Sequence, residues 1–298
     1  MHILLLTNPV AGHRSRRATP EALAAAFIAG GWQVTSRATT GPGSARTLAR
    51  NAAEEGFDAV FAGAGDGTLS DVVQGLLGTG VPAGIVPMGT GNDFARTIGL
   101  SLDPMGAIAE HLAGAPAPVD LLEVDDGREW AINVMGVGFD ANVARRVNVR
   151  SRVTGGLLAY LSCVCAELVS YRPVGVELTI DGAGWSGDAL LVAIANARSY
   201  GAGMMIAPHA EVDDGLLDLV VVEHMSRSNF LVNFPRVMRG THLSHPAVHT
   251  WRGREVRVET DEPSPVLIDG DLKGETPVQV RIAPGRAILW MPGECEPR

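Results

Sequence analysis

Lysine is almost absent from this chain of 298 residues, because Lys273 is the only one. A Walker-type phosphate loop ends in Gly-Lys followed by Ser or Thr, so the chain has no such loop. No strand-like run ends in Gly-x-Gly-x-x-Gly with an acidic residue about 20 positions further on, which excludes the usual dinucleotide fingerprint. The net charge of −9 also argues against nucleic acid as the main partner, since no basic surplus is present to neutralise phosphates.

Cysteines and long apolar runs are scarce as well. Cys163, Cys165 and Cys295 form an odd count without metal-ligand spacing, which favours a reducing, cytoplasmic compartment. No run approaches the roughly 20 apolar residues that a membrane span needs, and the first residues do not read as a signal peptide. The histidines show no paired spacing and no Gly-x-Ser-x-Gly elbow is present, so zinc chemistry and serine hydrolysis are poorly supported.

Glycine, in contrast, is abundant, and its most informative cluster is residues 63–68, Gly-Ala-Gly-Asp-Gly-Thr. These residues lie between an apolar run and a segment with apolar residues at helical spacing, which predicts a strand, a glycine turn and a helix start. Backbone N–H groups at a helix N-terminus bind anions. We expect a nucleotide phosphate here, with a metal held by Asp66. The alternative is a tight turn in which Asp66 or Thr68 only caps the helix.

Two further loops have the same character. Residues 88–96, Met-Gly-Thr-Gly-Asn-Asp-Phe-Ala-Arg, and residues 8–12, Asn-Pro-Val-Ala-Gly, each follow an apolar strand-like run. The carboxyl ends of parallel strands share one edge of a sheet, where such sheets bind ligands. We therefore expect the three loops to form one phosphate site. Asn92 and Asp93 have a simpler alternative role as caps of the helix that follows them.

The pattern of apolar runs changes near residue 120. Before it, strands and helices alternate, which predicts a parallel sheet with covering helices. The expected strands are 2–7, 32–39, 58–63 and 83–87, and the expected helices about 19–29, 43–55, 69–77 and 92–99. Residues 114–118, Gly-Ala-Pro-Ala-Pro, are expected to form a linker. Beyond them, apolar runs separated by Asp-Gly and Pro-Gly turns predict antiparallel β structure. These runs are 130–135, 174–181, 188–195, 216–223, 255–260, 265–269 and 278–282, with helices near 139–149, 155–170 and 228–240.

Six sequence blocks resemble the diacylglycerol kinase catalytic-domain family, in particular the bacterial lipid kinases related to diacylglycerol and sphingosine kinases. The blocks are 8–12, 65–69, 84–96, 133–141, 207–218 and 268–271, and they span nearly the whole chain in family order. The resemblance implies a soluble enzyme, peripheral to the membrane, that uses ATP and Mg²⁺ to phosphorylate a lipid hydroxyl, diacylglycerol first.

The same resemblance implies two domains with the active site in the cleft between them. Residues 1–122, completed by a return strand at about 287–298, are expected to be an α/β nucleotide-binding domain with a parallel sheet. Residues 123–286 are expected to be an antiparallel, β-sandwich-like domain that binds the lipid acceptor. At 298 residues, two domains also agree with usual domain sizes.

The resemblance assigns roles to individual residues. Asp271 is implied as the general base, because an alcohol is a poor nucleophile unless its proton is accepted. A structural Mg²⁺ is implied at the Asp214 carboxylate and the backbone carbonyls of Glu211 and Leu216, with a solvated turn as the alternative. The implied ATP-binding residues are Asn8, Pro9, Val10, Ala11, Gly12, Thr39, Gly65, Asp66, Gly67, Thr68, Leu69, Ser70, Asp71 and Thr90.

Three positions depart from the family pattern. Ala64 and Ser70 stand where glycine and asparagine are usual, and Asp271 stands where the family has the glutamate proposed as base. Aspartate keeps the carboxylate but shortens its reach by one methylene, and we interpret it as a conservative change. Two alternatives stay open: an NAD kinase-like or other small-alcohol kinase of the superfamily, and a catalytically degenerate regulator that binds nucleotide or lipid. The acceptor and the oligomeric state stay open too, with a homodimer as one alternative.

A lipid acceptor needs an apolar slot, for which the sequence offers one candidate. Residues 157–161, with Cys165, Leu168 and Val169, could line it beside Met204 and Met205, although a helix this apolar is more often core. The arginines that precede this segment could contact anionic head groups. The simpler interpretation is that these arginines are on a solvated face. These are Arg145, Arg146, Arg150 and Arg152. Lys273 could likewise meet a phosphate or head group, or be solvated.

Overall fold

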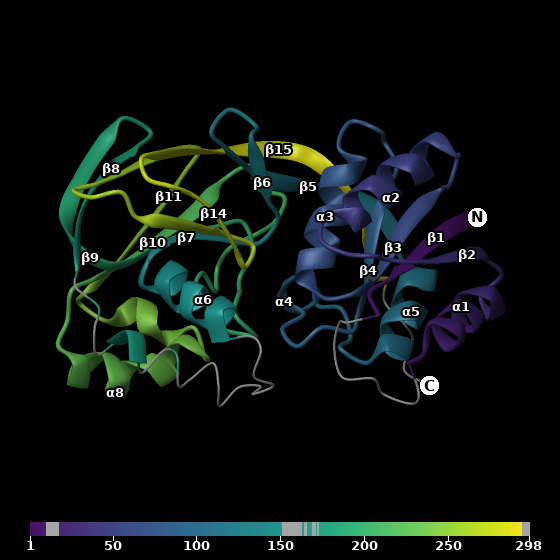
Figure 1. The fold of residues 1–298 in the computed structure, drawn as a ribbon, viewed down its shortest axis with the longest axis horizontal. Helices are drawn as coiled ribbons and strands as arrows, with labels where there is room; N and C mark the ends of the chain where they lie inside the picture. The colour runs from purple at the N-terminus through teal and green to yellow at the C-terminus, as the bar shows by residue number, and fades with distance from the viewer. Residues whose placement is uncertain (10–17, 151–162, 164–165, 169–170, 172, 294–298) are drawn as a thin grey trace. The chain divides into compact units, whose positions relative to one another are not determined.

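The computed structural model describes residues 1–9, 18–150, 163, 166–168, 171 and 173–293 (Figure 1). The contacts divide the chain into two compact units. The first comprises Met1–Leu121, Gly201–Gly203 and Pro284–Arg298, and the second comprises Leu122–Tyr200 and Met204–Ala283. The chain therefore leaves the first unit after Leu121, rejoins it briefly at Gly201–Gly203 and returns to it at Pro284.

The first unit has a parallel sheet with the strand order β4-β3-β1-β2. Its strands β1, β3 and β4 are almost fully buried, and their near-continuous apolar sequences are typical of parallel strands covered on both faces. The strands are β1 (His2–Thr7), β2 (Gln33–Ala38), β3 (Ala59–Ala64) and β4 (Ala83–Pro87). The helices are α1 (Pro20–Ala29), α2 (Ser44–Glu54), α3 (Asp66–Leu76), α4 (Asp93–Thr97) and α5 (Pro104–Ala113). The predicted alternation of strand and helix is confirmed, and α5 was not predicted.

Helix α5 begins with strong local signals. The Asp103 side chain accepts a hydrogen bond of 2.9 Å from the Gly106 amide, and Pro104 occupies the first helical turn. Near its end, Nε2 of the buried His111 lies 2.7 Å from the Ile85 carbonyl oxygen of β4, and the His111 carbonyl accepts a 2.8 Å hydrogen bond from Trp290 Nε1. These bonds connect α5 to the sheet and to the last strand, β15 (Val278–Met291), whose Leu289 pairs with Ala83.

The expected linker at 114–118 is wrong. Residues Ala115–Val124 form strand β5, which pairs with β6 (Glu129–Ala131) and with β15. A Cβ atom on Gly114 would lie 2.0 Å from the Met291 carbonyl oxygen, so the backbone is packed tightly against the end of β15. Proline has no N–H group to donate to a neighbouring strand, so within sheets it occurs at strand starts and in edge strands. The Pro-Ala-Pro pattern therefore resembles a linker although it lies at the start of a strand.

The second unit is predominantly antiparallel, as predicted. Its main strand order is β14-β13-β7-β9-β8-β12-β15, and β10 pairs with β9 and β11. The strands not yet given are β7 (Val134–Gly138), β8 (Val174–Ile180), β9 (Ala183–Ala195), β10 (Leu217–Glu223), β11 (Val248–Gly253), β12 (Glu255–Thr260), β13 (Pro265–Ile268) and β14 (Asp271–Glu275). Helices α6 (Phe139–Arg150) and α8 (Arg227–Val237) and the 3₁₀ helix η1 (Thr241–Ser244) also belong to this unit.

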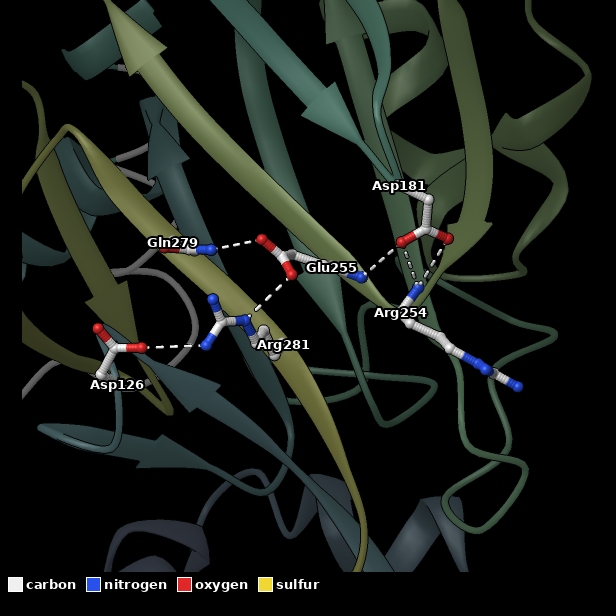
Figure 2. Close-up of polar contacts among 6 residues, drawn as sticks. All are labelled: Asp126, Asp181, Arg254, Glu255, Gln279 and Arg281. Carbon is white, nitrogen blue, oxygen red and sulfur yellow. Dashed lines mark hydrogen bonds and ion pairs between the residues drawn. The ribbon is translucent and has the colours of Figure 1, made fainter.

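Aspartates at hairpin turns connect strands that are distant in sequence (Figure 2). At the β8–β9 turn, Asp181 and Gly182 both have positive φ, the conformation for which Asp-Gly is favoured. The Asp181 carboxylate accepts hydrogen bonds of 2.9 to 3.1 Å from the Arg254 and Glu255 amides at the start of β12. Arg281 of β15 then contacts the Glu255 carboxylate at 3.0 Å. The turn thereby fixes the position of β12 beside β8 and β15.

Among the described residues, no helix is both long enough and apolar enough to cross a lipid bilayer.

Candidate functional site

The glycine turn at residues 63–68 joins the buried strand β3 directly to helix α3. Gly65 is the residue before the helix, and Asp66 begins it. The Thr68 and Leu69 amides donate to the Gly65 carbonyl oxygen at 3.1 and 3.2 Å. These two predicted phosphate-binding amides are therefore already engaged within the first turn. The Asp66 and Gly67 amides belong to the first residues of the helix, and no helical carbonyl oxygen precedes them to accept a hydrogen bond.

The glycine turn is packed against the loop after β4, backbone to backbone. A Cβ atom on Gly65 would lie 3.1 Å from Gly89 Cα, and one on Gly89 would lie 2.6 Å from Gly65 Cα. Real Cβ atoms essentially never come as close as 2.6 Å to another heavy atom, so Gly89 has no room for a side chain, and a 3.1 Å contact leaves Gly65 very little. Two of the three loops that the sequence predicts to converge are therefore in direct contact.

Asp66 connects the two loops. Its Oδ1 atom accepts a 2.9 Å hydrogen bond from the Phe94 amide in α4. Burial raises the pKa of the Asp66 carboxyl above its ordinary value, and the neighbouring Asp93 charge adds to that rise, while backbone amides oppose it. A Cβ atom on Gly91 would lie 3.3 Å from Asp66 Oδ2 and 2.8 Å from Asp93 Oδ2. Both carboxylates therefore border Gly91.

Asn92 and Asp93 do not cap α4 with their side chains, so the simple capping interpretation is wrong. Asn92 stands at the cap position with φ of 51°, and its side chain instead bonds to both backbone groups of Gly89, at 2.8 and 2.9 Å. The buried Asp93 carboxylate accepts hydrogen bonds from the Ala202 and Gly203 amides, at 2.9 and 2.7 Å. Asp93 thus binds residues 202 and 203, which belong to the first unit although the residues before and after Gly201–Gly203 belong to the second.

The other predicted nucleotide-binding residues fall into two groups. Asn8 and Pro9 follow β1, Thr39 follows β2 and the exposed Thr90 follows β4, so all four lie at the carboxyl ends of parallel strands. The remaining residues of the first loop, Val10, Ala11 and Gly12, lie outside the described residues.

Ser70 and Asp71 make contacts away from the glycine loops. Ser70 Oγ accepts a 3.1 Å hydrogen bond from Gln74 in the next turn of α3, and Asp71 Oδ1 lies 3.8 Å from Arg46 NH2 of α2. Ser70 thus contacts its own helix and Asp71 contacts α2, which favours a structural role for both side chains.

Asp271 lies in the second unit, in the β13–β14 hairpin. Asp269 and Gly270 form the turn, with positive φ at both, and Ile268 pairs with Asp271 across it. The Asp269 carboxylate accepts amide hydrogen bonds from Ile132, Asn133 and Val134, at 2.9 to 3.3 Å. The exposed Asp271 side chain makes no hydrogen bond or ion pair with any described residue. Asp269 therefore fixes the turn and leaves the neighbouring carboxylate open to solvent.

Three of the side chains predicted to contact phosphate or head groups are already bonded to other side chains. Lys273 Nζ forms a 2.6 Å ion pair with Glu129 Oε2, and Arg146 pairs with Glu167. Arg145 donates to the Asn142 side chain at 2.8 Å. The side chain of Arg150, and Arg152, lie outside the described residues.

The loop expected to hold a structural Mg²⁺ has an internal cationic partner. Oδ1 of Asp214 accepts a 3.0 Å hydrogen bond from the Leu216 amide, and Oδ2 pairs with the Arg252 guanidinium. Arg252 also lies 3.4 Å from Asp218, whose pKa burial raises. No group of three or more histidine, cysteine or acidic side chains that could hold a metal occurs in the described part of the chain. A cation at Asp214 would have to compete with Arg252.

The second unit contains an apolar cavity of about 90 Å³. Its walls come from α6, α8, η1 and several strands, and include Phe139, Leu190, Met204, Phe230, Phe234 and Val248. The predicted lining residue Met204 is thus present, Met205 is not among the lining residues, and residues 157–161 lie outside those the structure describes.

One carboxylate lines this cavity, and sequence analysis assigned no role to it. Asp140 is buried, and its Oδ1 accepts a 2.7 Å hydrogen bond from the Ala141 amide, while Oδ2 lacks a hydrogen-bond partner among the described residues. Burial raises the pKa of Asp140 to about 7, although hydrogen bonds from Ala141 and Tyr200 oppose that shift. A Cβ atom on Gly136 would lie 1.8 Å from Asp140 Oδ2. The glycine at 136, which belongs to a predicted motif, therefore makes room for this side chain.

The parallel sheet with its Gly-Asp-Gly-Thr turn and the antiparallel unit are features of a class of kinases. Comparison with known proteins specifies the family. Residues 2–124 match the diacylglycerol kinase catalytic domain, and residues 133–290 match the YegS C-terminal NAD kinase beta sandwich-like domain. The chain belongs to the diacylglycerol kinase catalytic-domain family of lipid kinases, which are phosphotransferases.

Individual relatives agree with this assignment. The chain is 35% identical over 295 residues to a protein of Mycobacterium tuberculosis (strain ATCC 25618 / H37Rv) named diacylglycerol kinase, covering 97% of this chain and 95% of the relative. It is 30% identical to a probable lipid kinase YegS-like of Stenotrophomonas maltophilia (strain K279a), covering 89% of each. A crystal structure of a diacylglycerol kinase from Bacillus anthracis str. Sterne shares the fold, with a TM-score of 0.77, 24% identity and 96% of each chain covered.

Proposed function

We propose that this protein transfers the γ-phosphate of ATP, with Mg²⁺, to a hydroxyl group of a lipid, and that diacylglycerol is the first acceptor to test. The observation that carries the proposal is the position of Asp66, a partly buried carboxylate at a helix N-terminus that is bonded to a second glycine loop. The names of the relatives support a lipid acceptor.

Phosphoryl transfer asks a protein mainly to position the reactants and to neutralise charge. The start of α3 supplies amides and the positive end of a helix dipole for phosphate oxygens. Asp66 is suited to be a magnesium ligand, because this cation prefers carboxylate oxygens. Its Oδ1 atom accepts the hydrogen bond from Phe94, whereas its Oδ2 atom borders Gly91. When bound, Mg²⁺ would neutralise charge on the phosphates. Asp93, whose two oxygens already accept amides, positions the loop instead.

Asp271 is our candidate for the base that accepts the proton of the acceptor hydroxyl. Its carboxylate is exposed and has no partner among the described residues, as a base that must meet a substrate requires. The Asp269 carboxylate accepts hydrogen bonds from three amides and so fixes the turn that immediately precedes Asp271.

The cavity of the second unit is our candidate for the apolar part of the acceptor. Its walls are predominantly aliphatic and aromatic, which suits an acyl chain, and Asp140 supplies one polar group that can bond to a hydroxyl. A lipid acceptor also implies that the protein works at the cytoplasmic surface of a membrane. The loop at Asp214 remains our proposed structural Mg²⁺ site, in competition with Arg252.

A transfer assay with radiolabelled ATP tests the proposal. The full chain is incubated with Mg²⁺ and detergent micelles that contain diacylglycerol, phosphatidylglycerol, ceramide or sphingosine, and separately with NAD. Label in diacylglycerol is the expected result, and label in another lipid changes the acceptor only. Label in NAD alone would establish the NAD kinase alternative. ATP binding without transfer to any alcohol would establish the regulatory alternative.

A further inference from the structure

The turn Gly201–Gly203 belongs to the first unit, although the residues on either side of it belong to the second. Its three residues all have positive φ, of 60°, 70° and 98°. Glycine adopts this conformation easily, whereas it is unfavourable for Ala202. The Ala202 side chain is exposed, so its own packing does not hold the turn. Contacts from outside the turn must therefore maintain this backbone conformation.

Asp93 makes such contacts. Its buried carboxylate accepts hydrogen bonds from the Ala202 and Gly203 amides at 2.9 and 2.7 Å, one on each oxygen. Hydrogen bonds to a charged acceptor are stronger than neutral ones, and two of them fix two successive peptide groups. A Cβ atom on Gly91 would lie 3.4 Å from the Ala202 nitrogen and 3.3 Å from Oδ2 of Asp66. The turn therefore lies against the same glycine as the carboxylate that we propose as a magnesium ligand.

The two residues that flank this turn line the cavity of the second unit. Tyr200 and Met204 exchange backbone hydrogen bonds of 3.1 and 3.0 Å, and both belong to the cavity wall. Met204 is only 6% exposed and is part of a core cluster, against which Tyr200 packs. The Tyr200 side chain also bonds to Asp140. Because only three residues separate the paired ones, a change in the turn must be accommodated at the cavity wall.

We propose that Asp93 is a positioning residue for the lipid acceptor. Its carboxylate holds the turn Gly201–Gly203, and the turn fixes Tyr200 and Met204 in the wall of the cavity. This inference rests on the proposed function, which assigns the cavity to the acceptor, and adds that a residue of the glycine loop controls acceptor binding. A nucleotide that stabilises the loop after β4 should then favour acceptor binding, and the acceptor should favour nucleotide binding to the same extent.

Two substitutions release the turn in different ways. Asp93→Asn keeps one accepting oxygen but places an amide NH₂ group opposite the second backbone donor, so one of the two hydrogen bonds is lost. Ala202→Val leaves Asp93 and the glycine loops unchanged, but positive φ is strongly unfavourable for a β-branched residue. Asp126→Val is the control for that strain. Asp126 also has positive φ, of 55°, but it is exposed in the turn between β5 and β6 and does not line the cavity.

Steady-state kinetics of the full chain with micelles that contain diacylglycerol tests the proposal. The KM for diacylglycerol should rise about tenfold in Asp93→Asn and in Ala202→Val, as is usual for coupled sites, while ATP affinity from direct binding changes little. The double variant should be no worse than the weaker single variant, because both changes act through one turn. Asp126→Val should keep the wild-type KM. An unchanged KM in folded Asp93→Asn and Ala202→Val overturns the proposal, and so do additive effects in the double variant.

Amide hydrogen exchange, followed for single residues by NMR, tests the same link without any substrate. In Asp93→Asn the Ala202 and Gly203 amides should exchange several-fold faster, and so should the Tyr200 and Met204 amides that bond to each other's residues. Melting curves check that each variant folds. Faster exchange confined to Ala202 and Gly203 overturns the proposal. If exchange spreads as expected but the wild type phosphorylates no lipid, only the proposed function is overturned, because the exchange result does not depend on it.

Discussion

The Phe94 amide donates a 2.9 Å hydrogen bond to Oδ1 of Asp66. This bond joins the helix after β3 to the helix after β4, at the point where Gly65 and Gly89 touch. A carboxylate in such a place is costly to bury, and its raised pKa reports that cost. A group whose environment opposes its charge is a candidate functional group, because a cation would restore the balance.

We therefore expect Asp66→Asn to remove catalysis while keeping the fold. The asparagine oxygen can still accept from the Phe94 amide, but the charge that would hold Mg²⁺ is lost. Turnover should fall by about 10²-fold or more. Steady-state kinetics measures the loss, and Asp71→Asn is the matched control, because Asp71 faces Arg46 of α2. Near-normal turnover in Asp66→Asn would exclude Asp66 from the chemistry.

The sequence predicted the strands of the first unit well, because runs such as β1 and β3 are buried on both faces and read as continuous apolar segments. It failed where a local signal has two meanings. The prolines of 114–118 indicated a linker, and they occupy the first residues of β5 instead. Asn92 and Asp93 indicated a cap, although their side chains bond to Gly89 and to residues 202–203.

The parts of the site that escaped prediction depend on contacts between distant residues. Asp93 and Ala202 are 109 positions apart, and Asp269 and Ile132 are 137 apart. No periodicity or spacing within one segment reports such a pairing. The cavity around Asp140 is likewise assembled from helices and strands spread over the second unit. The sequence block that contains Asp140 was evident, but its burial was not.

Asp140 should make stability depend on pH. Its pKa is about 7 in the folded protein and near 3.8 in an exposed carboxyl. Between these values the folded state binds the proton that the unfolded state has released, so stability should fall as pH rises from about 4 to about 7 and then level off. Asp140→Asn removes this titration. Its melting temperature relative to wild type should therefore rise by several degrees between pH 5 and pH 8.

Melting curves at several pH values measure this difference. The same substitution at Asp188, which is exposed on β9 and does not line the cavity, is the control for the loss of a carboxylate. A melting-temperature difference between Asp140→Asn and wild type that stays constant from pH 5 to pH 8 would show that Asp140 does not titrate in this range.

The Asp214 loop offers a test based on competition. If Asp214 holds Mg²⁺, the ion must displace the Arg252 guanidinium. Arg252→Gln should then increase the Mg²⁺-induced rise in melting temperature, and Asp214→Ala should reduce it, because binding stabilises only the folded state. Each protein is melted with Mg²⁺ and with a chelator, so that the direct effect of the substitution cancels. Equal Mg²⁺ shifts in all three proteins would make the Asp214–Arg252 contact a structural ion pair without a metal.

Asp271 is the position where the sequence differs most from its family, and it allows a gain-of-activity test. If it is the base, Asp271→Asn should lower turnover by about 10²-fold or more with little change in ATP affinity, because an amide cannot take the proton. Asp271→Glu should keep or raise turnover, since the longer side chain restores the family's reach. The Asp269 amide contacts are untouched by either change, so the hairpin should persist.

Parallel measurements of lipid phosphorylation and ATP binding distinguish the outcomes. Glu275→Gln, which removes an exposed carboxylate from the same strand, should behave like wild type. Wild-type turnover in Asp271→Asn would place the base at another residue. A wild type that binds ATP but phosphorylates no alcohol, together with activity in Asp271→Glu, would mean that the missing methylene has inactivated the enzyme. The exposed carboxylate at 271, which has no partner among the described residues, would then be the remnant of a base that no longer reaches its substrate.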